Sequence, residues 1–148
     1  MDARTTLDAV PLDAAAAAKA AFAAVEGMPF PDDIFTAPEL RWAVVGCGVI
    51  ANQMARSLAL AGRKVYGVAN RRLEKAEAFA CEYGVQRVCR TVEELYSDPA
   101  VDAIYITTPH NTHIEYLRGA LSAGKHVLCE KSITLNSDEL AEARAHDA

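Results

Sequence analysis

The chain has little positive charge, no long apolar run and no cysteine pattern typical of a metal or redox site. Its 15 lysines and arginines stand against 20 aspartates and glutamates, which leaves a net charge of −5 over 148 residues. General binders of nucleic acid or of anionic membranes carry a basic surface, so neither partner is expected here and any anion site must be local. No apolar stretch reaches the roughly 20 residues of a transmembrane helix.

The cysteines and the N-terminus also lack the patterns of secreted proteins. The four cysteines have no zinc or redox spacing, and most lie in or beside apolar runs, where cysteine acts as a small hydrophobe. The N-terminus carries several aspartates and Lys19 interrupts its alanine run, so the basic start and unbroken apolar core of a signal peptide are missing. Reduced thiols in a cytoplasmic protein are therefore expected at Cys47, Cys81, Cys89 and Cys129.

Residues 1–40 differ in composition from the rest of the chain. An alanine-rich patch at 14–24 precedes a loop punctuated by prolines. Alanine favours helix, but a run with so few large apolar side chains buries little surface. We interpret 1–40 as an extension, either a weakly docked helix or a flexible arm. It either has no catalytic role or binds a partner.

From Arg41 onward, short β-rich runs alternate with helical segments, the pattern typical of a parallel sheet with crossover helices. Right-handed crossovers predict an α/β domain, 41–148, with a doubly wound parallel sheet. The expected strands are 41–46, 64–69, 86–89, 102–107 and 125–129. The expected helices are 49–61, 73–83, 92–97, 112–123 and 137–147. Glycines follow three of these helices, where a left-handed residue is common, at Gly62, Gly84 and Gly124.

The sequence GCGVIA places a GxGxxA turn between the first strand and the first helix. Gly46 permits a turn closed to most side chains, Gly48 lets the backbone approach phosphates, and Ala51 lets the helix pack closely. The helix N-terminus, at Val49 and Ile50, offers unpaired N–H groups to an anion. The turn predicts a dinucleotide pyrophosphate site, although glycine turns also serve as simple connections.

The second strand ends at Asn70, roughly 20 residues beyond the glycine turn, where a ribose-binding acid is expected in a dinucleotide fold. Instead of an acid, Asn70 is followed by Arg71 and Arg72. Nothing there repels a 2′-phosphate, and a guanidinium is available to pair with it. This favours NADP over NAD, the alternative being that the arginines are a solvated helix start.

The fourth strand runs into Pro109-His110-Asn111-Thr112-His113, a polar cluster at the point where a buried strand emerges. Thr112 is placed to cap the next helix, with Glu115 in its first turn. His110 and His113 also fit an HxxH metal pair, but no third ligand stands at recognisable spacing. We therefore expect no metal, and expect at least one histidine to hydrogen-bond a cofactor or substrate.

The fifth strand ends in Glu130-Lys131-Ser132. A lysine leaving a buried strand into a cleft is partly desolvated, which lowers its pKa and makes it a proton donor or acceptor beside a carbinol oxygen. Glu130 can orient this lysine or hydrogen-bond the cofactor. The alternative for both residues is an exposed loop ion pair.

Together these motifs resemble the N-terminal half of the Gfo/Idh/MocA oxidoreductase family, the relatives of glucose-fructose oxidoreductase and inositol dehydrogenase. The resemblance covers about 40–148 and rests on GCGVIA, ANR, TTPHNTH and AGKHVLCEK in family order and spacing. It implies a Rossmann fold, an NAD(P) cofactor, a small-molecule substrate and a homo-oligomer for a full-length form. In the family's EKP motif the lysine is the catalytic acid/base and the glutamate contacts the cofactor, which implies these roles for Lys131 and Glu130.

The resemblance also implies which further residues meet the cofactor. Asn70-Arg71 is similar to the NADP-using members, such as the dimeric dihydrodiol dehydrogenases, so NADP is expected, with NAD as the alternative. The loop that lines the cofactor in the family matches Thr107, Thr108, Pro109, His110, Asn111 and His113.

Two departures from the family are visible. Ser132 replaces the proline of EKP, which loosens the expected rigidity of the loop but leaves Lys131 in place. The family's second domain, a largely antiparallel sheet that supplies substrate contacts, has no counterpart. We therefore expect the last Rossmann strand and the C-terminal α+β substrate domain to be missing, and the chain to be truncated.

The sequence predicts an NADP-dependent oxidoreductase domain that transfers a hydride between nicotinamide and a sugar, polyol, dihydrodiol or similar secondary alcohol. Lys131 handles the hydroxyl proton, and the chain alone is expected to be inactive. The alternative is a non-catalytic nucleotide-binding module or a gene fragment. An S-adenosylmethionine site is disfavoured, because such sites normally have an acidic residue after the second strand, where this chain has Asn70.

Overall fold

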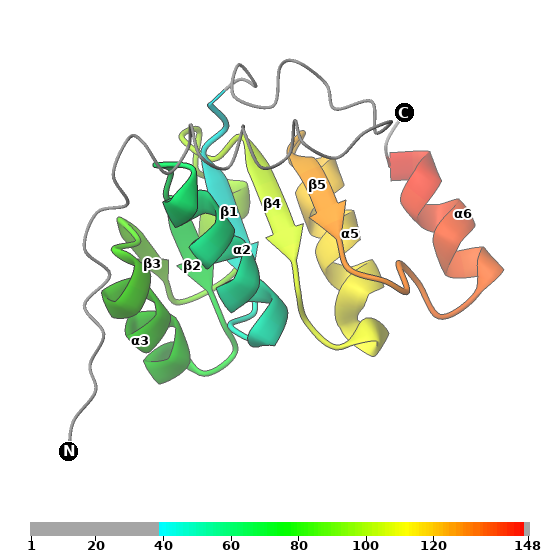
Figure 1. Ribbon diagram of the computed structural model, residues 1–148. Coiled ribbons are helices and arrows are strands. Elements are labelled where there is room, and N and C mark those ends of the chain that lie inside the picture. The colour runs from blue at the N-terminus through cyan, green and yellow to red at the C-terminus, as the bar shows by residue number, and fades with distance from the viewer. Residues whose placement is uncertain (1–38, 147–148) are drawn as a thin grey trace, which may run out of the picture.

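A computed structural model describes residues 39–146, as five strands and the helices that connect them (Figure 1). Every strand and helix predicted for 41–148 is present, with ends that match the predicted ones or differ by at most three residues. The predicted extension at 1–40 lies outside the described residues, apart from its last two positions. In chain order the elements are β1 (Trp42–Val45), α2 (Val49–Leu60), β2 (Gly67–Ala69), α3 (Leu73–Tyr83), β3 (Arg87–Cys89), α4 (Glu93–Tyr96), β4 (Ala103–Ile106), the 3-10 turn η1 (His110–Thr112), α5 (His113–Ser122), β5 (His126–Cys129) and α6 (Ser137–His146).

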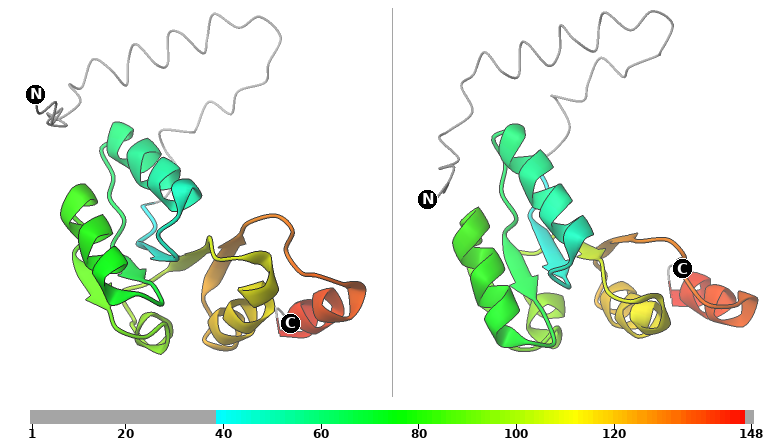
Figure 2. Two further views of the ribbon diagram at one scale, coloured as in Figure 1. Left: turned by 90° about the horizontal axis from the view of Figure 1, so that it is seen from below. Right: turned by 60° about the horizontal axis from the view of Figure 1, so that its bottom comes forward.

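The five strands form one parallel sheet in the order β3-β2-β1-β4-β5. Helices α2 and α3 contribute to the apolar core on one face, and α4, α5 and α6 to the core on the other (Figure 2). The chain therefore starts in the middle of the sheet, winds outward to β3, and returns to wind outward again to β5. This confirms the predicted doubly wound sheet.

The strands all end at the same level of the sheet. Val45, the last residue of β1, is level with Ala69 of β2 on one side and with Ile106 of β4 on the other. Cys89 of β3 and Cys129 of β5 are level with Ala69 and Ile106 in turn. The residues that immediately follow the strands therefore lie along a single edge, which is where ligands bind in open α/β sheets.

The central strands are buried on both faces, as their uncharged sequences predict. Val44 and Tyr105 pack toward α2 and α3, while Ile104 and Ile106 pack into the core on the opposite face. Ala51, which is fully buried, allows α2 to lie close to the sheet, as predicted from the glycine turn. The φ angles at Gly62, Gly84 and Gly124 are 71°, 64° and 68°, which confirms the predicted left-handed helix ends.

The outer strand β5 is only partly covered by the described residues. Among residues 39–146 its single neighbour in the sheet is β4, and its Leu128 is 46% exposed. Ile133 and Leu135 in the following loop are also exposed. Among residues 39–146 no helix is long and apolar enough to cross a membrane.

Candidate nucleotide-binding site

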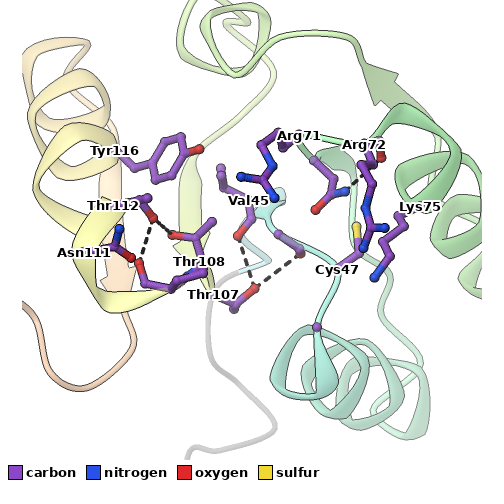
Figure 3. A pocket seen from close by; sticks show the side chains of 14 residues that line it. Val45, Cys47, Arg71, Arg72, Lys75, Thr107, Thr108, Asn111, Thr112 and Tyr116 are labelled. Atoms are coloured by element: carbon purple, nitrogen blue, oxygen red, sulfur yellow. Dashed lines mark hydrogen bonds between the residues drawn. The ribbon is translucent and has the colours of Figure 1, made fainter.

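A cleft of about 460 Å³ lies at the carboxyl edge of the sheet, between the loops that follow β1, β2 and β4 (Figure 3). It brings together eight residues predicted for the site: Gly46, Gly48, Asn70, Arg71, Thr107, Thr108, Pro109 and Asn111. The other lining residues are Val45, Cys47, Arg72, Lys75, Thr112 and Tyr116. Five predicted residues are outside this lining, namely Val49, Ile50, His110, His113 and Glu130, together with the predicted acid/base Lys131.

Gly46 sits where the chain leaves β1 and passes close to β4. Its φ is 97°, a conformation that side chains disfavour. An added Cβ would lie 3.0 Å from Thr107 Oγ1 and 3.2 Å from the Thr107 backbone. The Thr107 hydroxyl in turn lies 3.1 Å from the carbonyl oxygen of Val45 and 3.3 Å from that of Gly46. The glycine at this position therefore lets the ends of β1 and β4 meet at the base of the cleft.

Gly48 differs from Gly46, because a Cβ added there meets no atom within 4 Å. Its backbone is extended and it forms the N-cap of α2 without a side-chain cap or an acidic residue in the first turn. The N–H groups of that turn, at Val49 and Ile50, are those that an α-helix leaves without an internal partner. Gly48 thus keeps open a space in front of a helix N-terminus, where an anion is favoured.

The flank of the cleft beside β2 is cationic. Arg71, Arg72 and Lys75 line it, no carboxylate of residues 39–146 does, and all three cations are exposed at the surface (Figure 3). Asn70 holds the loop that presents them, because its side-chain amide donates to the carbonyl oxygen of Arg72 at 2.8 Å. This flank is suited to a group with more than one negative charge.

The weakly acidic side chains in the cleft stay neutral. Burial, which outweighs the opposing charge of Lys75, raises the pKa of the Cys47 thiol to about 11. Burial also raises the pKa of the Tyr116 hydroxyl above its ordinary value. Neither group therefore places a negative charge beside the cations near neutral pH.

The loop after β4 is fastened by its own hydroxyl groups. The Thr112 hydroxyl donates to the carbonyl oxygen of Pro109 at 2.7 Å and lies 2.9 Å from the Thr108 hydroxyl. Thr112 does occupy the N-cap of α5, with Glu115 in the first turn, but it makes no side-chain cap bond. The predicted capping bond is thus wrong, because the η1 turn folds the hydroxyl back onto the loop.

His113 is fully buried beneath the cleft instead of lining it. Its Nδ1 lies 2.8 Å from the carbonyl oxygen of Ser132 and its Nε2 lies 2.8 Å from that of Thr108. One side chain therefore joins the loop after β4 to the loop after β5. Any contribution of His113 to ligand binding comes through these loops.

His110 is exposed and packs edge-on against the His113 ring, with 5.5 Å between the ring centroids. Since backbone carbonyl oxygens occupy both ring nitrogens of His113, the two histidines do not form a metal-binding pair. No group of three or more His, Cys, Asp or Glu side chains within residues 39–146 is arranged to hold a metal ion.

Glu130 and Lys131 follow the end of β5, beyond the cleft on the β4 side. The Tyr105 hydroxyl donates a hydrogen bond to the Glu130 carboxylate. We expected Lys131 to be partly desolvated because it follows a strand end. It is instead exposed among the described residues. The reason is that β5 is an edge strand whose far side has no neighbour in the described sheet.

Lys75 and Tyr116 line the cleft but were not predicted from the sequence. Position in the helix is the signal that could have found them. Lys75 is the third residue of α3 and Tyr116 is the fourth residue of α5, so each lies in the first turn of a helix that begins beside a strand-end loop.

Comparison with known families agrees with this geometry. A family model described as an oxidoreductase family with an NAD-binding Rossmann fold, Gfo/Idh/MocA, matches residues 40–147. The chain belongs to the Gfo/Idh/MocA family. Its described part is the NAD(P)-binding Rossmann domain of that family, and the resemblance seen in the sequence is confirmed.

Curated members of the family include two similar enzymes. The mouse (Mus musculus) trans-1,2-dihydrobenzene-1,2-diol dehydrogenase is 40% identical over 106 residues, which cover 70% of this chain and 32% of that protein. The 1,5-anhydro-D-fructose reductase of Ensifer adhaerens is 35% identical over 103 residues, covering 69% of this chain and 31% of the enzyme. The chain thus matches about a third of the length of these relatives.

Solved structures of the family share the fold. A 3-ketoreductase from Actinomadura kijaniata, in complex with NADP, superimposes with a TM-score of 0.66 at 32% identity, over 74% of this chain and 36% of that one. A probable dehydrogenase from Thermotoga maritima gives a TM-score of 0.69 at 29% identity, over 73% and 33% of the two chains.

The two glycines of the turn should respond differently to substitution by alanine. Gly46→Ala should lower the free energy of unfolding by about 1–3 kcal/mol, because the backbone is left-handed and Thr107 is in the way. Gly48→Ala should change the free energy of unfolding by less than about 0.5 kcal/mol but weaken binding of an NAD(P) cofactor roughly tenfold, since its methyl group enters the open space. Urea unfolding and calorimetric titration measure these quantities. Unchanged affinity for the cofactor in Gly48→Ala would contradict the assignment of this space to the pyrophosphate.

Removing the His113 ring should loosen both cleft loops. His113→Ala should lower the free energy of unfolding by about 2–4 kcal/mol, because a fully buried ring is removed and a carbonyl oxygen that it contacts loses its hydrogen-bond donor. The exposed His126 provides the control, and His126→Ala should change it by less than about 0.5 kcal/mol. Urea unfolding of both variants checks this, and similar losses in the two would show that His113 does not fasten the loops.

Proposed function

We propose that the cleft binds NADP(H) in preference to NAD(H), as part of an oxidoreductase that acts on a sugar, polyol, dihydrodiol or similar secondary alcohol. The observation that carries the proposal is the cationic flank beside β2, where Arg71, Arg72 and Lys75 gather and no carboxylate from the described part of the chain joins them. An acid at this position would hydrogen-bond the ribose 2′-hydroxyl of NAD and repel the 2′-phosphate of NADP. Arginine pairs with phosphate through two parallel bonds.

The remaining residues of the cleft fit the rest of the cofactor. The open space at Gly48 and the N–H groups at Val49 and Ile50 suit the pyrophosphate. Thr107, Thr108, Pro109 and Asn111 would line the cofactor on the other flank. Glu130 and His110 are proposed as contacts near the nicotinamide half, beyond the end of β4.

In the proposed reaction, the nicotinamide of the bound cofactor supplies or accepts the hydride. The Lys131 ammonium would donate a proton to the carbonyl oxygen of the substrate during reduction, and the neutral amine would accept the hydroxyl proton during oxidation. Lys131 is exposed in the described residues. A part of the protein that covers β5 would therefore have to exclude water from this side chain as it encloses the substrate.

The names of the relatives support the substrate class. The similar enzymes act on a dihydrodiol and on an anhydro sugar, and the similar solved ketoreductase was captured with NADP. All carry out chemistry at a carbon that bears oxygen. We also propose that this protein is cytoplasmic and that a form which includes a substrate domain assembles into a homo-oligomer.

The second candidate function is a nucleotide-binding module without catalytic activity. The exposure of Lys131 within the described residues favours it. Titration with NADPH followed by an assay of NADPH oxidation with a panel of keto sugars separates the two candidates. Binding without turnover supports the module, whereas turnover supports the enzyme.

Arg71 should select between the two cofactors. Arg71→Ala should weaken NADP⁺ binding roughly 10- to 100-fold, the effect of losing a hydrogen-bonded charge, and leave NAD⁺ binding within about twofold. Arg144→Ala, on α6 and outside the cleft, is the matched control and should change neither affinity. Calorimetry provides the four dissociation constants. Equal losses for both cofactors would show that Arg71 does not contact the 2′-phosphate.

Lys131 should matter for turnover and not for cofactor binding. In a form that carries a substrate domain, Lys131→Ala should lower kcat by at least about 100-fold, since general acid–base catalysis typically contributes that much. NADPH affinity should stay within about twofold. Lys64→Ala, an exposed lysine in the loop between α2 and β2, is the control. Turnover retained in Lys131→Ala would remove this residue from the mechanism.

A further inference from the structure

Tyr105 is a polar residue in the middle of the apolar strand β4. Its neighbours Ile104 and Ile106 are fully buried, and Tyr105 itself is 7% exposed. It packs with Val44 and with the alanines of α2. A phenylalanine would fill the same space without the cost of burying a hydroxyl group. The hydroxyl therefore needs an explanation beyond packing.

The partner of this hydroxyl is Glu130, the residue that immediately precedes Lys131. The Tyr105 hydroxyl donates to Oε1 of the Glu130 carboxylate. The sheet register explains why the two meet. Tyr105 is level with Leu128 on β5, and Glu130 stands two residues beyond Leu128, so it lies on the same face as a diagonal neighbour. The Glu130 backbone N–H, bonded to the carbonyl oxygen of Ile106 at 3.1 Å, fixes this register one residue past the strand.

The electrostatic environment keeps the proton on Tyr105. Burial, supported by the neighbouring Glu130 carboxylate, raises the pKa of the tyrosine to about 12. The phenol therefore remains a donor throughout the neutral range. A hydrogen bond from a buried donor to a carboxylate is stronger than one between neutral groups and restricts where the carboxylate can point.

Glu130 lies at the opposite end of the sheet edge from the cationic flank. The strand order places β1 and β4 between β2, where Arg71 follows, and β5, where Glu130 follows. Three strand spacings separate these ends, about 14 Å. A dinucleotide with its 2′-phosphate at β2 and its pyrophosphate at β1 would reach the β4–β5 end with its nicotinamide half.

We propose that Tyr105 is a positioning residue, which holds the Glu130 carboxylate in place to receive the nicotinamide half of the cofactor beside Lys131. The inference rests on the proposed NADP(H) function. Tyr105 acts through Glu130 and does not itself line the cleft. Its effect should therefore be confined to ligands that carry the nicotinamide nucleoside.

Two ligands distinguish positioning from a purely structural role. NADPH contains both halves of the dinucleotide, whereas 2′,5′-ADP contains only the half that would meet the cationic flank. Calorimetric titration of the full chain should show that Tyr105→Phe weakens NADPH about 5- to 30-fold, as expected for losing a hydrogen bond to a charged group, and leaves 2′,5′-ADP within about twofold.

The chain offers a matched control with the same kind of bond. The Tyr66 hydroxyl donates to the Asp98 carboxylate at 3.2 Å, and neither residue lines the cleft. Tyr66→Phe also removes a phenol from a carboxylate and should leave the affinities for both ligands unchanged. A loss of NADPH binding in both variants would mean that any such deletion disturbs the fold, and would overturn the inference.

Glu130→Gln provides a second, independent variant that does not alter the core. It should weaken NADPH and spare 2′,5′-ADP, as Tyr105→Phe does. The double variant should lose little more than either single variant, because both changes disable one unit. If Glu130→Gln binds NADPH like the unaltered chain, the inference fails even if Tyr105→Phe does not fold.

The remaining outcomes separate the inference from the proposed function. If Tyr105→Phe binds NADPH normally, or loses affinity for NADPH and 2′,5′-ADP equally, then Tyr105 does not position Glu130. Either result overturns the inference but leaves the proposed NADP(H) site unaffected. If the unaltered chain binds neither ligand, the proposed function itself is wrong.

Discussion

The common level at which all the strands end is the constraint on which the site depends. Val45, Ala69, Ile106 and Cys129 share one row of the sheet, so the residues after them face one edge although they are far apart in sequence. A slip of one residue between two strands would turn the following side chains to the other face of the sheet. The glycine turn, the cations and the Glu130–Lys131 pair therefore lie along one edge only while this register holds.

The two ends of the edge are built differently. The end beside β2 carries exposed cations. Across the cleft, the loop after β4 is held by Thr107, which packs against Gly46, and by the buried His113 ring. The end beside β5 has Glu130 fixed by Tyr105, but Lys131 is exposed and the strand has an open side. Binding of a phosphate-rich ligand is thus supported by residues already in place, whereas the proton transfer that we propose for Lys131 would require a further layer that excludes water from this side chain.

Most of the fold was predictable because alternating apolar runs, glycines and helical patterns are local signals, and a parallel sheet brings their ends together. The eight predicted residues that line the cleft were predictable for the same reason. The contacts of some other side chains were not: His113 turns inward to two carbonyl oxygens, Thr112 folds back onto Pro109, and Tyr105 in an apolar strand reaches Glu130. The His113–Ser132 and Tyr105–Glu130 contacts depend on how β4 and β5 lie side by side, and the Thr112 bond depends on the η1 turn, which the capping pattern does not contain.

We propose that the cationic flank beside β2, which has no carboxylate among the described residues, makes this Rossmann domain prefer NADP to NAD. Calorimetric titration of the unaltered chain with NADP⁺ and NAD⁺ at low and high salt tests this preference most directly. We expect tighter binding of NADP⁺, with an advantage that shrinks at high salt because the cations are exposed and screened. Equal affinities for the two cofactors at both salt concentrations would contradict it.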